Sequence, residues 1–107
     1  MVKKTINKEI KKKLARFKDA IESGGVPVGK VIVFGSYAKG RANKNSDIDV
    51  AVVSYKFGKN DVLEMQWLWK KTEGIDSRIE PYPVSPKDLK ENSSPIISEI
   101  NRYGVLI

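Results

Sequence analysis

The sequence predicts an α/β domain (α+β) in which short apolar strands are interspersed with helices. Three patterns carry this prediction: apolar residues at helical spacing near the start of the chain, two short strands rich in β-branched residues, and an alternating strand further on. With 107 residues, the chain is long enough for one hydrophobic core and too short for a second substrate-binding domain. We therefore expect residues 1–107 to form a single domain.

The first expected element is a helix over residues 5–22. Its apolar side chains recur every three or four positions and form one stripe, whereas its lysines fall outside that stripe. Gly24 and Gly25 supply the signal that ends the helix. The next segment, residues 28–34, is short, almost entirely apolar and rich in β-branched residues, which predicts a central strand covered on both faces.

The middle of the chain alternates between connections and regular elements. A Gly-Ser pair breaks the first strand, a helical turn is expected to start at Ser36, and residues 37–45 form a polar, basic connection. A second apolar strand is expected over residues 48–53. After a loop, Asp61 is expected to cap a helix that continues to about residue 72.

The last third of the chain predicts one more strand, one more helix and a short final strand. Apolar and polar residues alternate over residues 75–82, which predicts a half-buried strand that prolines then end. Serine-proline pairs at 85–86 and 94–95 are typical of a cap followed by proline at the first helical position. We expect a short turn after the first pair, a helix over 95–103 after the second, and a strand at 105–107.

The composition excludes several kinds of chemistry. The chain has no Cys and no His, which rules out disulfides, thiol nucleophiles, Ser-His-Asp triads and metal centres built on thiolate or imidazole. Chemistry based on oxygen ligands remains open. No apolar run approaches the roughly 20 residues that span a bilayer, and the basic start of the chain lacks the apolar stretch of a secretory signal. We therefore expect a cytoplasmic protein with no membrane partner.

A pair of aspartates opens the second predicted strand. Asp47 and Asp49 are two positions apart, so their side chains point the same way. Two like charges about 4 Å apart repel by roughly 4 kcal/mol at an effective dielectric of about 20, and a bound cation removes this cost. Since only oxygen ligands are available, the cation would be Mg²⁺ or Mn²⁺. The alternative is a solvated turn or a helix-capping pair.

The end of the first strand offers a phosphate site close to these acids. Gly35 lets the backbone approach a ligand, and Ser36 offers a hydroxyl group and free backbone N–H groups that favour phosphate oxygens. Because both motifs sit at ends of apolar strands, we favour a paired phosphate and metal site over two unrelated turns.

Together, the Gly-Ser pair, a ten-residue spacer and the Asp-Ile-Asp at 47–49 resemble the signature of the DNA polymerase β-type nucleotidyltransferase superfamily. Residues 35–40 are similar to the Gly-Ser-x-Ala-Arg/Lys-Gly pattern of its minimal nucleotidyltransferases, and the resemblance covers residues 28–82. It implies a mixed β-sheet backed by helices, ATP or another nucleoside triphosphate as the donor, and two divalent ions, Mg²⁺ or Mn²⁺.

The resemblance also implies a third carboxylate, on a neighbouring strand, that shares a metal with Asp47 and Asp49. Asp76 and Glu80 are the candidates, and Asp76 is preferred because residues 75–79 look like the corresponding strand of the family. The alternative is that these acids simply pair with Arg78. Basic side chains of the connection would contact the leaving phosphates or remain solvated: Lys39, Arg41 and Lys44.

Three functions agree with these residues. The first is transfer of AMP from ATP to a hydroxyl of a helical protein partner, because minimal members of the family act in this way as antitoxins of HEPN-domain toxins. The second is the same chemistry on a small molecule such as an aminoglycoside. The third is a non-catalytic module that binds nucleotide or a toxin. In the first two, attack at the α-phosphorus expels pyrophosphate.

Two surface features bear on partners. The formal net charge is +7 (20 Lys and Arg against 13 Asp and Glu), and the lysine-rich first helix would suit RNA or an acidic protein, or form only a solvated face. Trp67 and Trp69 lie about 200° apart around a helix and cannot both face one core. An exposed Trp would indicate an interface with another protein or a second copy of the chain; the alternative is that both are half-buried edge residues.

Overall fold

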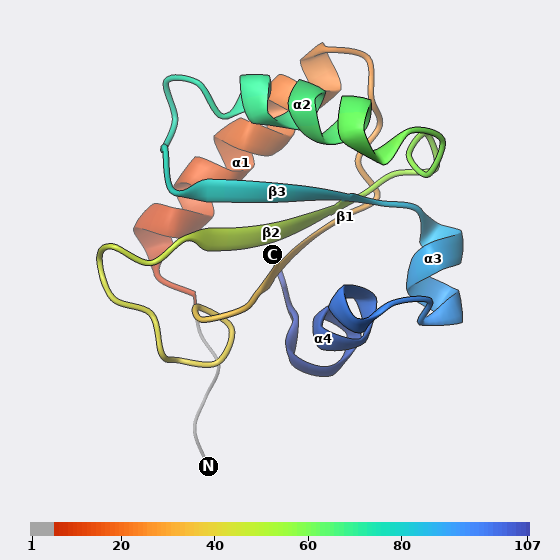
Figure 1. Cartoon of the computed structure of the whole chain (residues 1–107). Helices are drawn as coiled ribbons and strands as arrows, with labels where there is room; N and C mark the ends of the chain where they lie inside the picture. The colour runs from red at the N-terminus through yellow and green to blue at the C-terminus, as the bar shows by residue number, and fades with distance from the viewer. Residues whose placement is uncertain (1–5) are drawn as a thin grey trace.

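A β-sheet lies between two layers of helices in the computed structural model, which describes residues 6–107 (Figure 1). The expected start of the first helix at residue 5 lies outside the described residues. None of the helices within the described residues is long and apolar enough to cross a membrane. The elements in chain order are α1 (Lys8–Ser23), β1 (Lys30–Phe34), β2 (Ile48–Val53), α2 (Asp61–Lys71), β3 (Ile79–Val84), α3 (Pro86–Glu91), α4 (Pro95–Tyr103) and β4 (Val105–Leu106).

The sheet has four strands in the order β3-β2-β1-β4. Strand β1 pairs antiparallel with β2 and β4, whereas β2 and β3 run parallel, which confirms the mixed sheet that the resemblance implied. The register places Phe34 opposite Asp49 and Asp49 opposite Glu80. An acidic residue of β2 therefore lies between the end of β1 and an acidic residue of β3.

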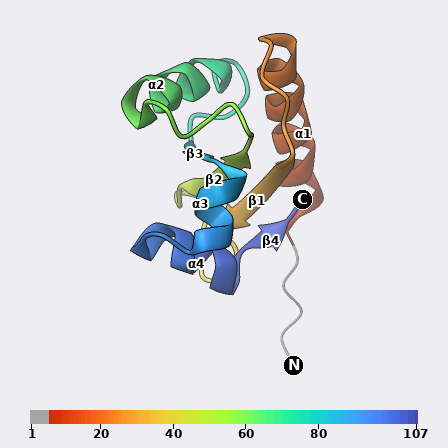
Figure 2. The same cartoon turned by 90° about the vertical axis from the view of Figure 1, so that its right-hand side faces the viewer.

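Helices cover both faces of the sheet, as the two views in Figures 1 and 2 show: α1 and α2 lie on one face, α3 and α4 on the other. Alternate residues of the central strands feed two separate cores. Val33 and Val50 pack with Phe17 of α1 in the first core; Ile32 and its neighbours pack with Ile97 of α4 in the second. Burial on both faces explains why these strands are almost entirely apolar.

The helix caps largely follow the sequence. Ser85 and Ser94 cap α3 and α4, each followed by proline, although the first pair opens a short helix rather than a turn. The expected cap of α2 is wrong by one position: the Asn60 side chain accepts a hydrogen bond from Leu63 N at 3.1 Å, and Asp61 is the first helical residue.

The turn expected at Ser36 is present: residues 35–40 form a single turn, closed by hydrogen bonds from Lys39 N to Gly35 O (3.1 Å) and from Arg41 N to Ser36 O (2.9 Å). The expected strand near residue 75 differs in extent. Strand β3 begins at Ile79, four residues later than expected, and runs on through two prolines. Proline is tolerated because β3 lies at the edge of the sheet and pairs only with β2.

Candidate active site

The two aspartates lie at the start of β2, where the chain arrives from the basic connection. Asp49 is half-buried on the face of the sheet that α4 covers, because it alternates with Ile48 and Val50 of the other core. Asp47 precedes the strand and is exposed. The predicted pair therefore comprises one carboxylate held in the protein and one open to solvent.

Asp49 lies in a strongly negative environment. Burial, and then the charges of Glu80, Asp47 and Glu99, together raise the pKa of this carboxyl to about 6. Glu99 comes from α4, fifty positions along the chain, and no local sequence pattern points to it. Because three other carboxylates act on Asp49, a cation at this place would remove an unfavourable charge interaction.

Gly35 is packed directly against Asp49. Its φ is +69°, in the left-handed region, and a Cβ at this position would overlap Asp49 Oδ2. The turn that carries Ser36 therefore contacts the carboxylate only because residue 35 has no side chain. This contact joins the two motifs that the sequence singled out.

Replacing Gly35 by alanine tests this contact. We expect Gly35→Ala to lower nucleotidyl transfer about tenfold, since the added methyl group pushes the Asp49 carboxylate out of place. Gly74→Ala is the matched control, because Gly74 has a similar φ of +77° and an added methyl group there would meet nothing within 4 Å. Both variants should lose about 1 kcal/mol in urea unfolding from the left-handed backbone. Equal transfer rates in the two variants would contradict the contact's role.

Lys39 is held against α4. Its Nζ forms an ion pair with Glu99 Oε1 at 2.6 Å and lies 4.7 Å from the centre of the Tyr103 ring. The lysine that the sequence assigned to the leaving phosphates is thus fixed within the same turn as Ser36. Ser36 and Arg41 are exposed.

Glu80, rather than Asp76, is the acidic neighbour of Asp49. The parallel register places Glu80 directly beside Asp49, and its Oε1 accepts a hydrogen bond from the Tyr82 hydroxyl at 3.3 Å. Burial raises the pKa of that hydroxyl to about 12, with Glu80 and Asp49 contributing. From the sequence, Glu80 is only the second candidate for the third carboxylate, because the pairing of β2 with β3 is what distinguishes it from Asp76.

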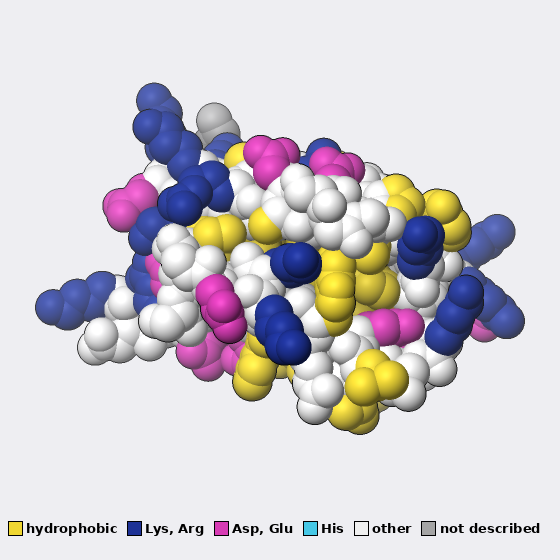
Figure 3. Space-filling model, turned by 90° about the horizontal axis from the view of Figure 1, so that it is seen from above, with side chains coloured by type: hydrophobic (Ala, Val, Ile, Leu, Met, Phe, Trp, Pro, Cys, Tyr) yellow, Lys and Arg dark blue, Asp and Glu magenta, His cyan; other side chains and the backbone are white. Residues whose placement is uncertain are grey.

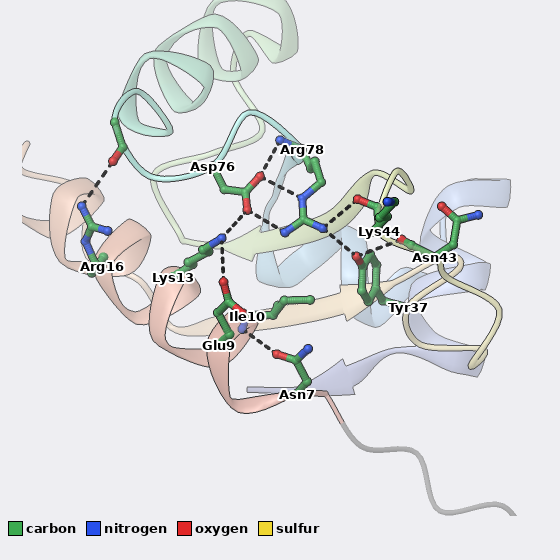
Figure 4. Close-up of polar contacts among 11 residues, drawn as sticks. Asn7, Glu9, Ile10, Lys13, Arg16, Tyr37, Asn43, Lys44, Asp76 and Arg78 are labelled. Atoms are coloured by element: carbon green, nitrogen blue, oxygen red, sulfur yellow. Dashed lines mark hydrogen bonds and ion pairs between the residues drawn. The ribbon is translucent and has the colours of Figure 1, made fainter.

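The expectation that Asp76 lies on a strand with Glu80 is wrong. Asp76 lies in the loop before β3, where its carboxylate accepts hydrogen bonds from neighbouring residues. Asp76 Oδ1 accepts from Arg78 N at 2.8 Å, while Oδ2 pairs with Lys13 and with Arg78, each at 2.8 Å (Figure 4). Hydrogen bonds from Arg78, and to a smaller extent from Lys13, hold the pKa of Asp76 well below its usual range. The alternative of an ion pair with Arg78 is confirmed for Asp76.

Arg78 connects this cluster to the basic connection. Its Nη1 donates to the Tyr37 hydroxyl at 3.2 Å and to Lys44 O at 3.1 Å (Figure 4). Since Lys13 belongs to α1, the Asp76 cluster joins α1, the loop before β3 and the segment between the Gly-Ser turn and Asp47. Through these contacts the cluster can fix the path of that segment.

The donor set fits a magnesium ion that is shared with a substrate. Among residues 6–107, no three acidic side chains converge closely enough to hold a metal ion by themselves. Mg²⁺ is commonly bound by one or two carboxylates, several waters and substrate phosphates. Asp47 and Asp49 supply two such carboxylates, and the excess negative charge around Asp49 favours a cation.

In this fold, a Gly-Ser turn meets an aspartate pair at one end of a mixed sheet. The family model of the nucleotidyltransferase domain matches residues 6–103, so the chain belongs to the nucleotidyltransferase domain family. No curated protein matches the chain at a significant level of sequence similarity.

Solved structures share this fold at low sequence identity. A toxin–antitoxin complex with AMP-PNP matches with a TM-score of 0.62 and 21% identity, over 94% of this chain and 72% of the other. A mutant of the toxin–antitoxin pair MntA-HpeT gives 0.57 and 20%, over 96% and 72%. A Sulfolobus solfataricus protein assigned as a nucleotidyltransferase gives 0.56 and 18%, over 95% and 87%.

Proposed function

We propose that this nucleotidyltransferase moves AMP from ATP to a hydroxyl of a protein partner, and that it serves as the antitoxin of a HEPN-type toxin. The observation that carries the chemistry is the contact between Gly35 and Asp49, which supports a phosphate site in the turn next to a metal site at the carboxylate. The family to which the chain belongs supports nucleotidyl transfer. Two structures with the same fold are toxin–antitoxin complexes, one of them with AMP-PNP, which supports the role and the donor.

In this proposal, Asp47 and Asp49 hold the divalent ions, and Glu80 takes the place of Asp76 as the carboxylate that accepts the proton of the acceptor hydroxyl. Bound Mg²⁺ would neutralise charge on the triphosphate and on the acceptor oxygen. The backbone N–H groups of the turn and the ammonium group of Lys39 bind the β- and γ-phosphates. For Lys39 this requires the ammonium group to share its charge between Glu99 and the nucleotide.

The transfer itself exchanges one P–O bond for another. The acceptor oxygen forms a bond to the α-phosphorus, and the bond from that phosphorus to the oxygen bridging the α- and β-phosphates breaks. Pyrophosphate leaves with the electron pair. The hydroxyl proton passes to the Glu80 carboxylate, which lies beside Asp49 in the sheet.

Co-expression with a HEPN-type toxin tests the proposal. We expect intact-mass spectrometry of the toxin to show the added mass of one or more AMP groups when the wild-type chain is present. The double variant Asp47→Ala, Asp49→Ala should still bind the toxin and leave its mass unchanged. An unmodified toxin in the presence of the wild-type chain, or equal modification by the double variant, would contradict the proposal.

A further inference from the structure

A hollow of about 410 Å³ opens next to the acidic site, at the edge of the sheet. Asp47, just before β2, Glu80 of β3 and Arg78 line it on one side, and Trp69 and Thr72 line it from the end of α2. Its volume falls within the range of small-molecule sites. The hollow therefore brings two of the site's carboxylates together with a large aromatic side chain.

The position of the hollow relative to the Gly-Ser turn indicates which reactant would enter the site from it. Along the sheet, the turn follows β1, Asp49 lies in β2 and the hollow borders β3, so Asp49 lies between the turn and the hollow. In an in-line displacement, the entering and leaving oxygens lie on opposite sides of the phosphorus. If the leaving phosphates occupy the turn, the acceptor hydroxyl arrives from the hollow.

The apolar surface continues from the hollow along α2. Trp69 is 53% exposed, Leu63 is 61% exposed, and both line a second, larger hollow of about 580 Å³ together with Trp67. Trp69 belongs to both hollows. Figure 3, which looks down on the helices α1 and α2, shows hydrophobic side chains at the surface with both basic and acidic side chains around them. A small acceptor would fill only the first hollow, whereas a protein would cover both.

The charge around α2 indicates which kind of protein fits. Lys70 and Glu73 border the larger hollow. The carboxylate of Glu64 is taken up by the backbone N–H groups of Gly58, Lys59 and Asn60, so it does not offset nearby lysines freely. Charges of both signs border the smaller hollow too, with Arg78 beside Asp47 and Glu80, so this surface suits a partner segment with apolar side chains flanked by both basic and acidic groups.

We propose that the exposed face of α2, centred on Trp69, binds the acceptor protein, and that the hollow beside Asp47 and Glu80 admits its hydroxyl-bearing side chain. This inference rests on the proposed function, since it names where the protein acceptor binds. Trp69 is a specificity-determining residue here and takes no part in the phosphate chemistry. A nucleobase and a second copy of the chain are the competing occupants.

The first experiment compares two truncations on α2, with a HEPN-type toxin as acceptor and Mg²⁺-ATP as donor. Trp69→Ala should raise the KM for the toxin about tenfold while leaving kcat and the affinity for Mg²⁺-ATP unchanged. Val62→Ala is the matched control, because Val62 is 67% exposed on the same helix and lines neither hollow. An unchanged KM in Trp69→Ala, or a loss of ATP affinity in its place, would overturn the inference.

The second experiment uses the fact that the chain has two tryptophans. In Trp67→Phe, all tryptophan fluorescence comes from Trp69. We expect the toxin to shift this emission to the blue and to protect it from acrylamide quenching, and Mg²⁺-AMP-PNP to leave it unchanged. A shift with Mg²⁺-AMP-PNP alone would identify a nucleobase as the occupant, and a shift with protein concentration alone would identify a second copy; either would overturn the inference.

The two proposals can fail separately. Toxin that protects Trp69 but acquires no AMP would contradict the proposed function and support the docking surface. Toxin that acquires AMP equally from the wild-type chain and from Trp69→Ala would support the proposed function and overturn the docking surface.

Discussion

Replacing Asp49 with asparagine is expected to abolish nucleotidyl transfer and, at the same time, to stabilise the metal-free protein at neutral pH. Transfer should fall by about 10³-fold, because a neutral amide is a poor ligand for Mg²⁺ and cannot offset charge that develops on the phosphates. Asparagine has nearly the shape of aspartate, so its packing against Gly35 is retained. Label transfer from ATP measures the first effect, and thermal unfolding measures the second.

The gain in stability follows from the pKa of Asp49. Its folded-state pKa of about 6 lies above the unfolded value of about 3.9. The folded protein therefore binds this proton more tightly, and the protein loses stability as the pH rises from about 4 through 6. Allowing for solvent screening of a half-exposed group, the loss is on the order of 1 kcal/mol, or about 4 °C in Tm for a domain of this size.

The pH dependence provides the control for Asp49→Asn. The variant should exceed the wild type in Tm at pH 7.5 and match it near about pH 3, where Asp49 is largely protonated in both the folded and the unfolded wild-type chain. Added Mg²⁺ should stabilise the wild type at pH 7.5 and leave the variant nearly unchanged. A variant that is less stable than the wild type at pH 7.5 would contradict the electrostatic picture of the site.

The second large effect separates Glu80 from Asp76. Glu80→Gln should lower kcat by about 10²-fold, through loss of the proton acceptor, and change the free energy of unfolding by less than about 0.5 kcal/mol. Asp76→Ala should instead lower the free energy of unfolding and leave kcat largely unchanged. Its carboxylate, 7% exposed, is the shared partner of Lys13 and Arg78, so its loss should cost about 2 kcal/mol of stability.

Steady-state transfer and urea unfolding, measured on both variants, decide between the two acids. Asp76→Ala should retain most of its kcat at a temperature where it remains folded. A catalytic defect in folded Asp76→Ala that equals the defect in Glu80→Gln would restore the assignment of Asp76 to the metal site. A strong loss of stability in Glu80→Gln would contradict the role that we give to Glu80.

The parts of the site that are local in sequence could be predicted from it. The spacing of Asp47 and Asp49, and the Gly-Ser pair at the end of an apolar strand, depend on side-chain alternation and backbone geometry within a few residues. The central strands β1 and β2 were also evident, because burial on both faces makes them continuously apolar.

The parts of the site that depend on tertiary contacts could not be predicted from the sequence. Asp76 and Glu80 fall on the same face of an alternating pattern, so the pattern does not distinguish them. The sequence does not show that Lys13, 63 positions away, pairs with Asp76. Glu99 reaches the site only because α4 packs on the face that carries Asp49. The helical spacing of the tryptophans did predict that they differ in exposure. Trp67 is half-buried against the first core, whereas Trp69 is exposed.

The most direct test of the central claim, that the Gly-Ser turn and its aspartates carry out nucleotidyl transfer, is to compare ATP labelled on the α-phosphate with ATP labelled on the γ-phosphate. With Mg²⁺ and a HEPN-type toxin, we expect α-label to become attached to the toxin and γ-label to be released as pyrophosphate. Both signals should disappear in Asp49→Asn. Attachment of γ-label to the toxin, or attachment of α-label that persists in Asp49→Asn, would contradict the claim.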